Sequence, residues 1–209
     1  MIFVNRAEAG TILAAKLRKY REENAVVMAI PRGGVPVAFE IAKSLGLPMD
    51  LALIKKIGHP NNKEYAIGAT SLTDYFIVPF EKVSQEYVTA EVQKIRKRLN
   101  EMHSKFMGSK PVRDLQGKTV IVVDDGVATG NTLMATLQVL RKGNPFKIVV
   151  AVPVASTNAV RKLKPEADEL ICISEPEEFY GVGAFYKDFD QVTDEEVMDY
   201  FRLLQSVPE

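Results

Sequence analysis

The stretch VIVVDDGVATGNT occupies residues 120–132 and changes character halfway along its length. Four apolar residues are followed by the carboxylates of Asp124 and Asp125, and then by GVATGNT, which is rich in glycine and small polar side chains. Residues 119–123 predict a buried parallel strand, because β-branched side chains suit both faces of such a strand. Residues 132–140 predict a helix. The polar half therefore lies at the carboxyl end of a strand, where α/β sheets bind ligands.

The polar half has the composition of a site for a monophosphate. Gly126 and Gly130 allow close backbone approach, and residues 128–132 offer backbone N–H groups and hydroxyls at the positive end of a helix. A nucleotide-binding P-loop needs Gly-Lys-Ser/Thr after a longer spacing, which this stretch lacks. The carboxylates of Asp124 and Asp125 do not favour an anion, so we expect them to bind vicinal hydroxyls and a magnesium ion nearby.

Short β-branched runs alternate with helical patterns along the rest of the chain. We expect buried parallel strands at residues 25–30, 51–54, 119–123, 148–152 and 169–173, and helices at 6–23, 35–45, 130–142 and 157–163. This alternation predicts an α/β fold with a Rossmann-like parallel sheet flanked by helices, in a single domain over residues 1–209.

Two helices and one insertion complete the expected organisation. A helix from Ser84 to about Phe106 carries an apolar stripe, which fits either core packing or a homodimer interface. Thr193 and Glu196 form a capping box, so a last helix is expected from residue 194 to about 204. Residues 55–83 mix turn formers, charges and short β-like pieces, which predicts a flexible loop insertion.

The bulk composition excludes several partner classes. Lys plus Arg and Asp plus Glu both number 27, so neither nucleic acid nor an anionic membrane surface is an expected partner. The basic run Lys94, Arg96, Lys97 and Arg98 is expected to be a solvated helix face. The single Cys172 cannot form an internal disulfide, and the sequence shows neither an export signal nor an apolar run of about 18 residues. We expect a cytoplasmic protein.

Residues 120–132 as a whole resemble the signature of the type I phosphoribosyltransferases, in which an apolar strand and two acids precede Ala-Thr-Gly-x-Thr. The resemblance implies that Asp124 and Asp125 hold the ribose hydroxyls of phosphoribosyl pyrophosphate (PRPP). It also implies Mg²⁺ as the cofactor, which reaches these acids only indirectly, through ribose hydroxyls or water. The implied binding residues for the 5-phosphate are Ala128, Thr129, Gly130, Asn131 and Thr132.

The loop after the first strand gives independent support. Its residues Arg32, Gly33 and Gly34 lead into a helix and resemble the family's pyrophosphate loop. The resemblance implies a non-proline cis peptide near Arg32 and Gly33, a bond that costs about 3 to 4 kcal/mol and persists where function fixes it. A plain strand-to-helix turn is the alternative interpretation.

A basic pair follows the second expected strand. Lys55 and Lys56 are similar to the lysines that precede the catalytic loop of adenine and orotate phosphoribosyltransferases. The resemblance implies that Lys55 and Lys56, with His59 and Lys63, approach the leaving pyrophosphate when the loop closes. The alternative is that these are ordinary exposed side chains of a polar loop.

The sequence says less about the base that accepts the phosphoribose than about its donor, PRPP. Hypoxanthine and guanine enzymes of the family carry an acid where this chain has Ala128, so a different nitrogenous base, or its nucleotide, is expected as substrate. The family builds its base-binding hood from variable segments, here expected from the termini, with residues 174–209 as its C-terminal part. Four aromatic residues there either stack on the base or form the hood's own small core: Phe179, Tyr180, Phe185 and Tyr186.

The whole chain most resembles a bacterial branch of phosphoribosyltransferases whose acceptor is unassigned. A function of another class also remains open, since some proteins of this fold sense PRPP without catalysis and regulate transcription. The sequence contains no recognisable helix-turn-helix domain, and its formal net charge is zero. Both observations favour the enzyme over the sensor.

Overall fold

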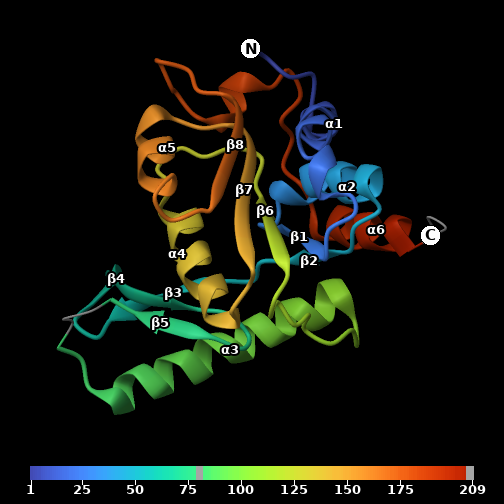
Figure 1. The fold of residues 1–209 in the computed structure, drawn as a ribbon. Helices are drawn as coiled ribbons and strands as arrows, with labels where there is room; N and C mark the ends of the chain where they lie inside the picture. The colour runs from blue at the N-terminus through green and yellow to red at the C-terminus, as the bar shows by residue number, and fades with distance from the viewer. Residues whose placement is uncertain (79–81, 206–209) are drawn as a thin grey trace.

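The computed structural model describes residues 1–78 and 82–205. Within these residues the main sheet has five strands in the order β2-β1-β6-β7-β8, all parallel (Figure 1). From β1 the chain passes to β2 on one side and then crosses back to β6 on the other. The strand order therefore changes direction between β1 and β6: β2 lies on one side of β1, and the later strands follow on the other. The loops after β1 and β6 lie side by side at this point. The strands are β1 (Ala25–Ala29), β2 (Met49–Leu51), β6 (Thr119–Val123), β7 (Lys147–Val154) and β8 (Glu169–Ser174).

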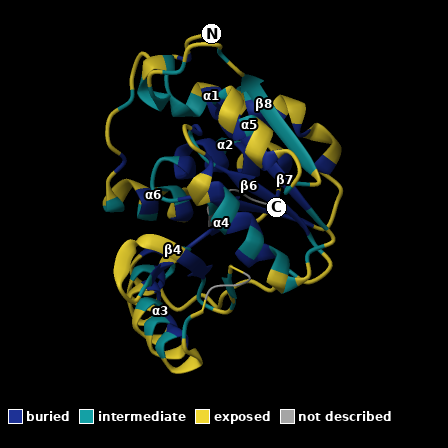
Figure 2. Cartoon of the chain, turned by 90° about the vertical axis from the view of Figure 1, so that its left-hand side faces the viewer, coloured by how far each residue is buried: buried dark blue, intermediate teal, exposed yellow. Residues whose placement is uncertain are grey.

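Helices cover both faces of this sheet. Figure 1 shows α1 (Arg6–Lys16), α2 (Gly34–Leu45) and α6 (Asp194–Gln205) on one face, and α4 (Asn131–Leu140) and α5 (Thr157–Leu163) on the other. Alternate strand residues belong to different cores: Val27 and Ile121 pack with α1, α2 and α6, whereas Val26 and Val120 pack with α4 and α5. Because both faces of the central strands are buried, β1, β6 and β7 are mostly apolar and dark blue in Figure 2, whereas the edge strand β8 is only partly buried and teal. The predicted fold class is confirmed.

A smaller antiparallel sheet and one long helix lie below the main sheet (Figure 1). Residues 55–77 form β3 (Lys55–His59), β4 (Asn62–Thr70) and β5 (Tyr75–Ile77), which pack on α3 (Gln85–Met107). The apolar stripe of α3 is core: Val88 and Val92 contact this sheet, while Leu99 and Phe106 join the main core. The outer face of α3 is exposed (Figure 2). A homodimer interface elsewhere stays a prediction.

Two expected elements need correction. The strand predicted at 51–54 is Met49–Leu51, because residues 49–51 are the ones that pair in register with Val27–Ala29. Ala52 and Leu53 are buried but belong to no strand, so their apolar side chains reflect packing in the core rather than strand pairing. The helix predicted at 6–23 ends at Lys16, after which a 3₁₀ turn at Arg18–Tyr20 follows.

The N-terminal segment pairs with the segment that precedes α6. Phe3 N–H donates to the Phe185 carbonyl at 2.8 Å, and Lys187 N–H donates to the Phe3 carbonyl at 2.9 Å. The predicted capping box is present, with Thr193 N–H donating to Glu196 Oε2 at 2.7 Å and Glu196 N–H donating to Thr193 Oγ1 at 3.2 Å.

Parts of the segments predicted at 55–83 and 174–209, namely residues 79–81 and 206–209, lie outside the described residues. Within those described, no helix is both long enough and apolar enough to cross a membrane.

Candidate functional site

The loops after β1 and β6 meet where the sheet reverses direction. Ile30 N–H donates to the Val123 carbonyl at 2.8 Å, which ties the two strand ends together. The non-proline cis peptide expected near Arg32 and Gly33 lies between Pro31 and Arg32. Gly33 touches the acidic pair so closely that a Cβ atom there would lie 2.1 Å from Asp125 Oδ2. The glycine is therefore required by the close approach of the two loops.

Asp124 and Asp125 follow the last residue of β6 and are both partly buried. Asp125 N–H donates to Asp124 Oδ1 at 2.9 Å. Burial, together with the neighbouring Asp125 charge, raises the pKa of Asp124 well above its ordinary value. Burial also raises the pKa of Asp125, while the Arg6 guanidinium acts in the opposite direction. The pair presents carboxylate oxygens that can accept hydrogen bonds from hydroxyls.

Arg6, the first residue of α1, is held on Asp125. Its Nε donates to Asp125 Oδ2 at 2.8 Å, and the two side chains are only 12% and 13% exposed. A second nitrogen donates to the Asp190 carbonyl at 2.8 Å, and the guanidinium lies 3.9 Å from the centre of the Phe189 ring. Sequence reasoning missed this residue. A signal existed, since a cation at a helix N-terminus opposes the helix dipole and indicates a partner elsewhere.

Tyr186, in the segment before α6, also hydrogen-bonds to Asp125. Its buried hydroxyl donates to the Asp125 carbonyl at 2.6 Å. The ring stacks on Phe189 at 5.0 Å between centroids and lies 5.4 Å from Phe3. Tyr186 thus belongs to a small terminal core, which was one of the two alternatives for the four aromatic residues.

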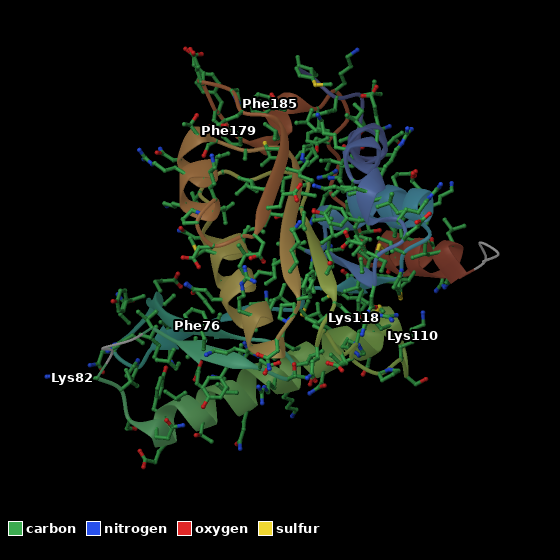
Figure 3. The ribbon with its side chains drawn as sticks, in the orientation of Figure 1. Phe76, Lys82, Lys110, Lys118, Phe179 and Phe185 are labelled. Atoms are coloured by element: carbon green, nitrogen blue, oxygen red, sulfur yellow. The ribbon has the colours of Figure 1, made fainter. Side chains whose placement is uncertain are left out.

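The other three aromatic residues differ in their surroundings. Phe185 belongs to the terminal core and lies 5.3 Å from Phe179, as the labelled rings in Figure 3 show. Phe179 also lines a cavity of about 650 Å³ together with Ala128 and Thr129. Tyr180 is 83% exposed, and its hydroxyl donates to Glu178. Among the four, Phe179 is the ring that the structure brings beside the predicted phosphate loop.

The predicted phosphate loop, residues 128–132, contains the glycine that caps α4. Gly130 has φ +76°, a conformation that favours glycine, and Asn131 begins the helix. Ala128, Thr129, Asn131 and Thr132 are exposed, so their polar groups face solvent at the positive end of α4.

Two residues outside the predicted set reach this loop. Ser156 Oγ donates to the Ala128 carbonyl at 2.6 Å, and Lys162 Nζ donates to the Thr129 carbonyl at 3.3 Å. Both line the cavity that contains Phe179. Sequence reasoning missed Ser156 and Lys162 because they lie beyond β7, and only the sheet order brings them here.

The predicted lysines divide into two groups. Lys55 and Lys56 begin β3, rather than ending the second strand of the main sheet, and they line a groove of about 600 Å³. Asn131 and Thr132 line the same groove. Lys56 Nζ pairs with Glu64 Oε2 at 2.8 Å. The structure thus brings Lys55 and Lys56 to the end of the phosphate loop.

His59 and Lys63 flank the turn between β3 and β4. Lys63 Nζ donates to the Tyr87 hydroxyl and pairs with Glu91 Oε2 at 3.2 Å, both on α3. His59 Nδ1 accepts from Asn61 N–H at 3.2 Å. The contacts of these two residues are therefore with the hairpin turn and α3, and the structure does not group them with residues 124–132.

The carboxylates offer little protein coordination to a metal. The described residues contain no cluster of three or more His, Cys, Asp or Glu side chains that could hold an ion. The two carboxylates of Asp124 and Asp125 are compatible with Mg²⁺, because Mg²⁺ commonly takes most of its oxygen ligands from substrate and water rather than from the protein.

Comparison with known proteins agrees with this geometry. Residues 4–189 match the model of the phosphoribosyl transferase domain. The crystal structure of TT1426 from Thermus thermophilus has a TM-score of 0.87 and 40% identity, over 98% of this chain and 99% of that one. A hypothetical protein from Neisseria gonorrhoeae, solved with bound ppGpp, has a TM-score of 0.51 over 98% of this chain and 96% of its own. At 17% identity it supports the fold alone.

Curated relatives from two strains of Mycobacterium tuberculosis carry the provisional name phosphoribosyl transferase. Each is 36% identical over 204 residues, which is 95% of this chain and 46% of the relative. The chain thus spans about half the length of these relatives. The resemblance found in residues 120–132 is confirmed, and the chain belongs to the phosphoribosyl transferase domain family.

Proposed function

We propose that this chain is a phosphoribosyltransferase that uses PRPP and Mg²⁺ to transfer phosphoribose to, or from, a nitrogenous base. One observation carries the proposal. The cis-peptide loop, the acidic pair and the glycine-capped start of α4 converge where the sheet reverses direction between β1 and β6. Each of the three has the chemistry required by one part of PRPP.

In this proposal the start of α4 binds the 5-phosphate. Backbone N–H groups and hydroxyls of residues 128–132, all exposed except Gly130, would donate to the phosphate oxygens. Asp124 and Asp125 would accept hydrogen bonds from the two ribose hydroxyls. The backbone of Arg32, Gly33 and Gly34 would hold the pyrophosphate. These contacts fix the anomeric carbon relative to the incoming base, and such positioning is a large part of catalysis.

Charge stabilisation would supply most of the remaining effect. Positive charge develops on the ribose ring as the bond to pyrophosphate breaks, and the nearby carboxylates of Asp124 and Asp125 favour that charge. Lys55 and Lys56 line the groove shared with Thr132 and would neutralise the departing pyrophosphate. When bound, Mg²⁺ would be held near Asp124 and Asp125 through substrate hydroxyls or water, and it would offset the negative charge of the leaving pyrophosphate.

The organisation of the chain is part of the same proposal. Residues 1–209 would act as one phosphoribosyltransferase domain. Within the insertion predicted at 55–83, the described strands β3, β4 and β5 would close over the pyrophosphate and exclude water. Residues 174–209 would form the C-terminal part of a base-binding hood, with Phe179 as its contact to the base. Ala128 offers no acid to a purine N–H, so hypoxanthine and guanine are not the proposed acceptors.

A turnover assay tests this proposal against PRPP sensing without catalysis. Purified protein would be mixed with PRPP, Mg²⁺ and a panel of bases that includes adenine, uracil, orotate and hypoxanthine, and released pyrophosphate would be measured. We expect release that depends on one base and is lost in Lys55→Ala/Lys56→Ala, while Lys118→Ala/Lys142→Ala, at exposed or partly exposed lysines outside the site, retains it. PRPP binding without release for any base would contradict catalysis and support sensing.

A further inference from the structure

A cavity of about 290 Å³ lies apart from the phosphate loop. It is lined by Met28 of β1, by β2 and the residues after it, by the turn at residues 71–74, by α3, by the end of α4 and the turn after it, and by the segment that connects α3 to β6. Figure 3 labels Lys110 and Lys118 in that connecting segment. Most of the wall is apolar, and its larger apolar members are Leu51, Leu53, Leu72, Leu115 and Leu140.

Two buried polar side chains interrupt this apolar wall. His103 is 8% exposed, and its Nε2 has no hydrogen-bond partner among the described residues. Asp50 is 6% exposed, and its Oδ1 accepts from Leu51 N–H at 2.7 Å. Burial raises the pKa of Asp50, while the Leu51 N–H and the charges of Arg113 and His103 act in the opposite direction. Buried polar atoms are nearly always hydrogen-bonded, so the His103 Nε2 requires an explanation.

Neither the proposed reaction nor a single bridging water explains the arrangement. The cavity wall contains none of the residues assigned to PRPP. A water molecule occupies roughly 30 Å³, whereas the volume here is close to the lower limit of roughly 300 Å³ for small-molecule sites. Apolar walls with a few convergent polar groups are also the usual composition of such a site.

We propose that this cavity binds a small, uncharged nitrogen heterocycle. Its ring would pack on the leucine side chains, an N–H group would donate to Asp50, and a ring nitrogen would accept from His103 Nε2. The wall carries charges of both signs, with Asp50, Asp74 and Asp114 as well as Arg113, so it gives no net preference to an anion or a cation, and a charged ligand would lose its hydration on entry. A pure hydrocarbon would leave the His103 Nε2 unpaired.

Histidine NMR tests the site directly. The chain has two histidines, so in the His59→Gln variant the imidazole nitrogen signals come from His103 alone. Benzimidazole, which carries both an N–H donor and a ring-nitrogen acceptor, would be titrated into this ¹⁵N-histidine-labelled protein beside indene, its hydrocarbon counterpart. We expect a saturable shift of the His103 Nε2 signal with benzimidazole and none with indene. An unshifted signal up to the solubility limit, or equal shifts from both compounds, would overturn the proposal.

Two variants locate the binding by ligand-observed saturation transfer. His103→Leu removes the polar atom while keeping an apolar side chain, and Val112→Trp fills the cavity from its rim, where Val112 is 44% exposed. Each should weaken benzimidazole binding at least tenfold. Val4→Trp, at a valine that is 45% exposed in the terminal segment, is the matched control and should leave the affinity unchanged. Unchanged affinity in both cavity variants would assign benzimidazole to another surface and overturn the site.

Discussion

Asp125 is contacted both by the first residue of α1 and by the segment that precedes α6. Arg6 from α1 pairs with its carboxylate, Tyr186 from the C-terminal segment donates to its carbonyl, and Gly33 leaves space for its Oδ2. These three contacts fix the carboxylate at the carboxyl end of β6. A partly buried acid that is fixed in this way is suited to orienting a ribose hydroxyl, provided that it stays ionised.

Removing Arg6 should make PRPP binding more sensitive to acid. Burial raises the pKa of Asp125 and Arg6 opposes that effect, so in Arg6→Met the pKa rises further. The ionised carboxylate accepts the ribose hydroxyl, so affinity is present above this pKa and is lost as the pH falls through it. We expect the loss to begin at higher pH in Arg6→Met, with affinity weakened about tenfold or more, since hydrogen bonds to charged groups contribute about 1.5 to 3 kcal/mol.

The measurement is the PRPP dissociation constant from pH 5 to pH 8 for wild type, Arg6→Met and Arg18→Met. Arg18 is exposed in the 3₁₀ turn that follows α1 and serves as the charge-matched control. Superimposable pH profiles for wild type and Arg6→Met would show that Arg6 has no influence on Asp125 as a ligand.

Gly33→Ala should weaken PRPP binding in addition to any loss of protein stability. The added Cβ would lie 2.1 Å from Asp125 Oδ2, so the carboxylate must move from its place in the site. We expect PRPP affinity to fall more than tenfold. Gly46→Ala is the informative control, because Gly46 has φ +65° but open space around it. That variant should lower the melting temperature by backbone strain while leaving PRPP affinity intact; equal PRPP affinity in Gly33→Ala and wild type would contradict the close-packing argument.

At the scale of residues, the sequence alone was enough to locate candidate site residues that lie close together in the chain. Asp124, Asp125 and Gly130 could be placed because the strand, the glycine and the helix start are contiguous. Arg6 and Tyr186 could not, since Arg6 is 119 residues from its partner and their meeting depends on how the whole chain folds. Lys63 is the converse case: the resemblance placed it near the leaving pyrophosphate, whereas in the structure its side chain contacts Tyr87 and Glu91 on α3.

The starts of β7 and β8 are joined by a cluster of charges at the opposite end of the sheet from the proposed site. Glu169 Oε2 accepts from Lys147 Nζ at 2.9 Å and from the Tyr20 hydroxyl at 2.6 Å, while Lys19 pairs with Oε1 at 2.7 Å. Burial alone would raise the pKa of Glu169, but hydrogen bonds from Lys19, Tyr20 and Lys147 lower it to about 2. The cluster therefore links the 3₁₀ turn that follows α1 to the starts of two strands.

This cluster should make stability depend on pH. Because the pKa of Glu169 is depressed on folding, its contribution is fully present above the ordinary value near 4.5 and is lost as the pH falls toward about 2. Glu169→Gln should cost about 1 to 3 kcal/mol in unfolding free energy at pH 7, with a smaller difference from wild type at pH 2.5.

Urea unfolding at both pH values measures this effect, with Glu22→Gln at an exposed position as the control. A difference of the same size at pH 7 and pH 2.5 would rule out the ionised Glu169 as its source.

At the scale of elements, the sequence predicted most of the main sheet. Residues 119–123 and 157–163 have the predicted boundaries because periodicity, burial and capping agree there. The second strand was misplaced because Ala52 and Leu53 are apolar for packing rather than for strand pairing. Residues 55–77 were predicted as a loop insertion, yet they form three strands among the residues described, since long-range pairing and packing on α3 outweigh weak local propensity.

The whole molecule places unrelated stretches together through the topology of its sheet. Residues 31–34 and 124–132 are far apart in sequence but follow neighbouring strands, and the reversal between β1 and β6 brings them to one edge. The fold class could be predicted because strands and helices alternate regularly. The groove shared by Lys55 and Thr132, and the cavity shared by Thr129, Lys162 and Phe179, arise only when the complete chain is assembled.

The central claim is that this edge of the sheet binds PRPP, and calorimetry with PRPP and Mg²⁺ tests it most directly. Wild type would be compared with Asp124→Asn/Asp125→Asn and with Glu22→Gln/Glu101→Gln, a control pair of exposed acids outside the site. We predict saturable binding in wild type and in the control, and affinity at least about a hundredfold weaker without the acidic pair, because hydrogen bonds to charged groups contribute about 1.5 to 3 kcal/mol each. Absence of binding in folded wild type at millimolar PRPP, or equal affinity in all three proteins, would contradict the account.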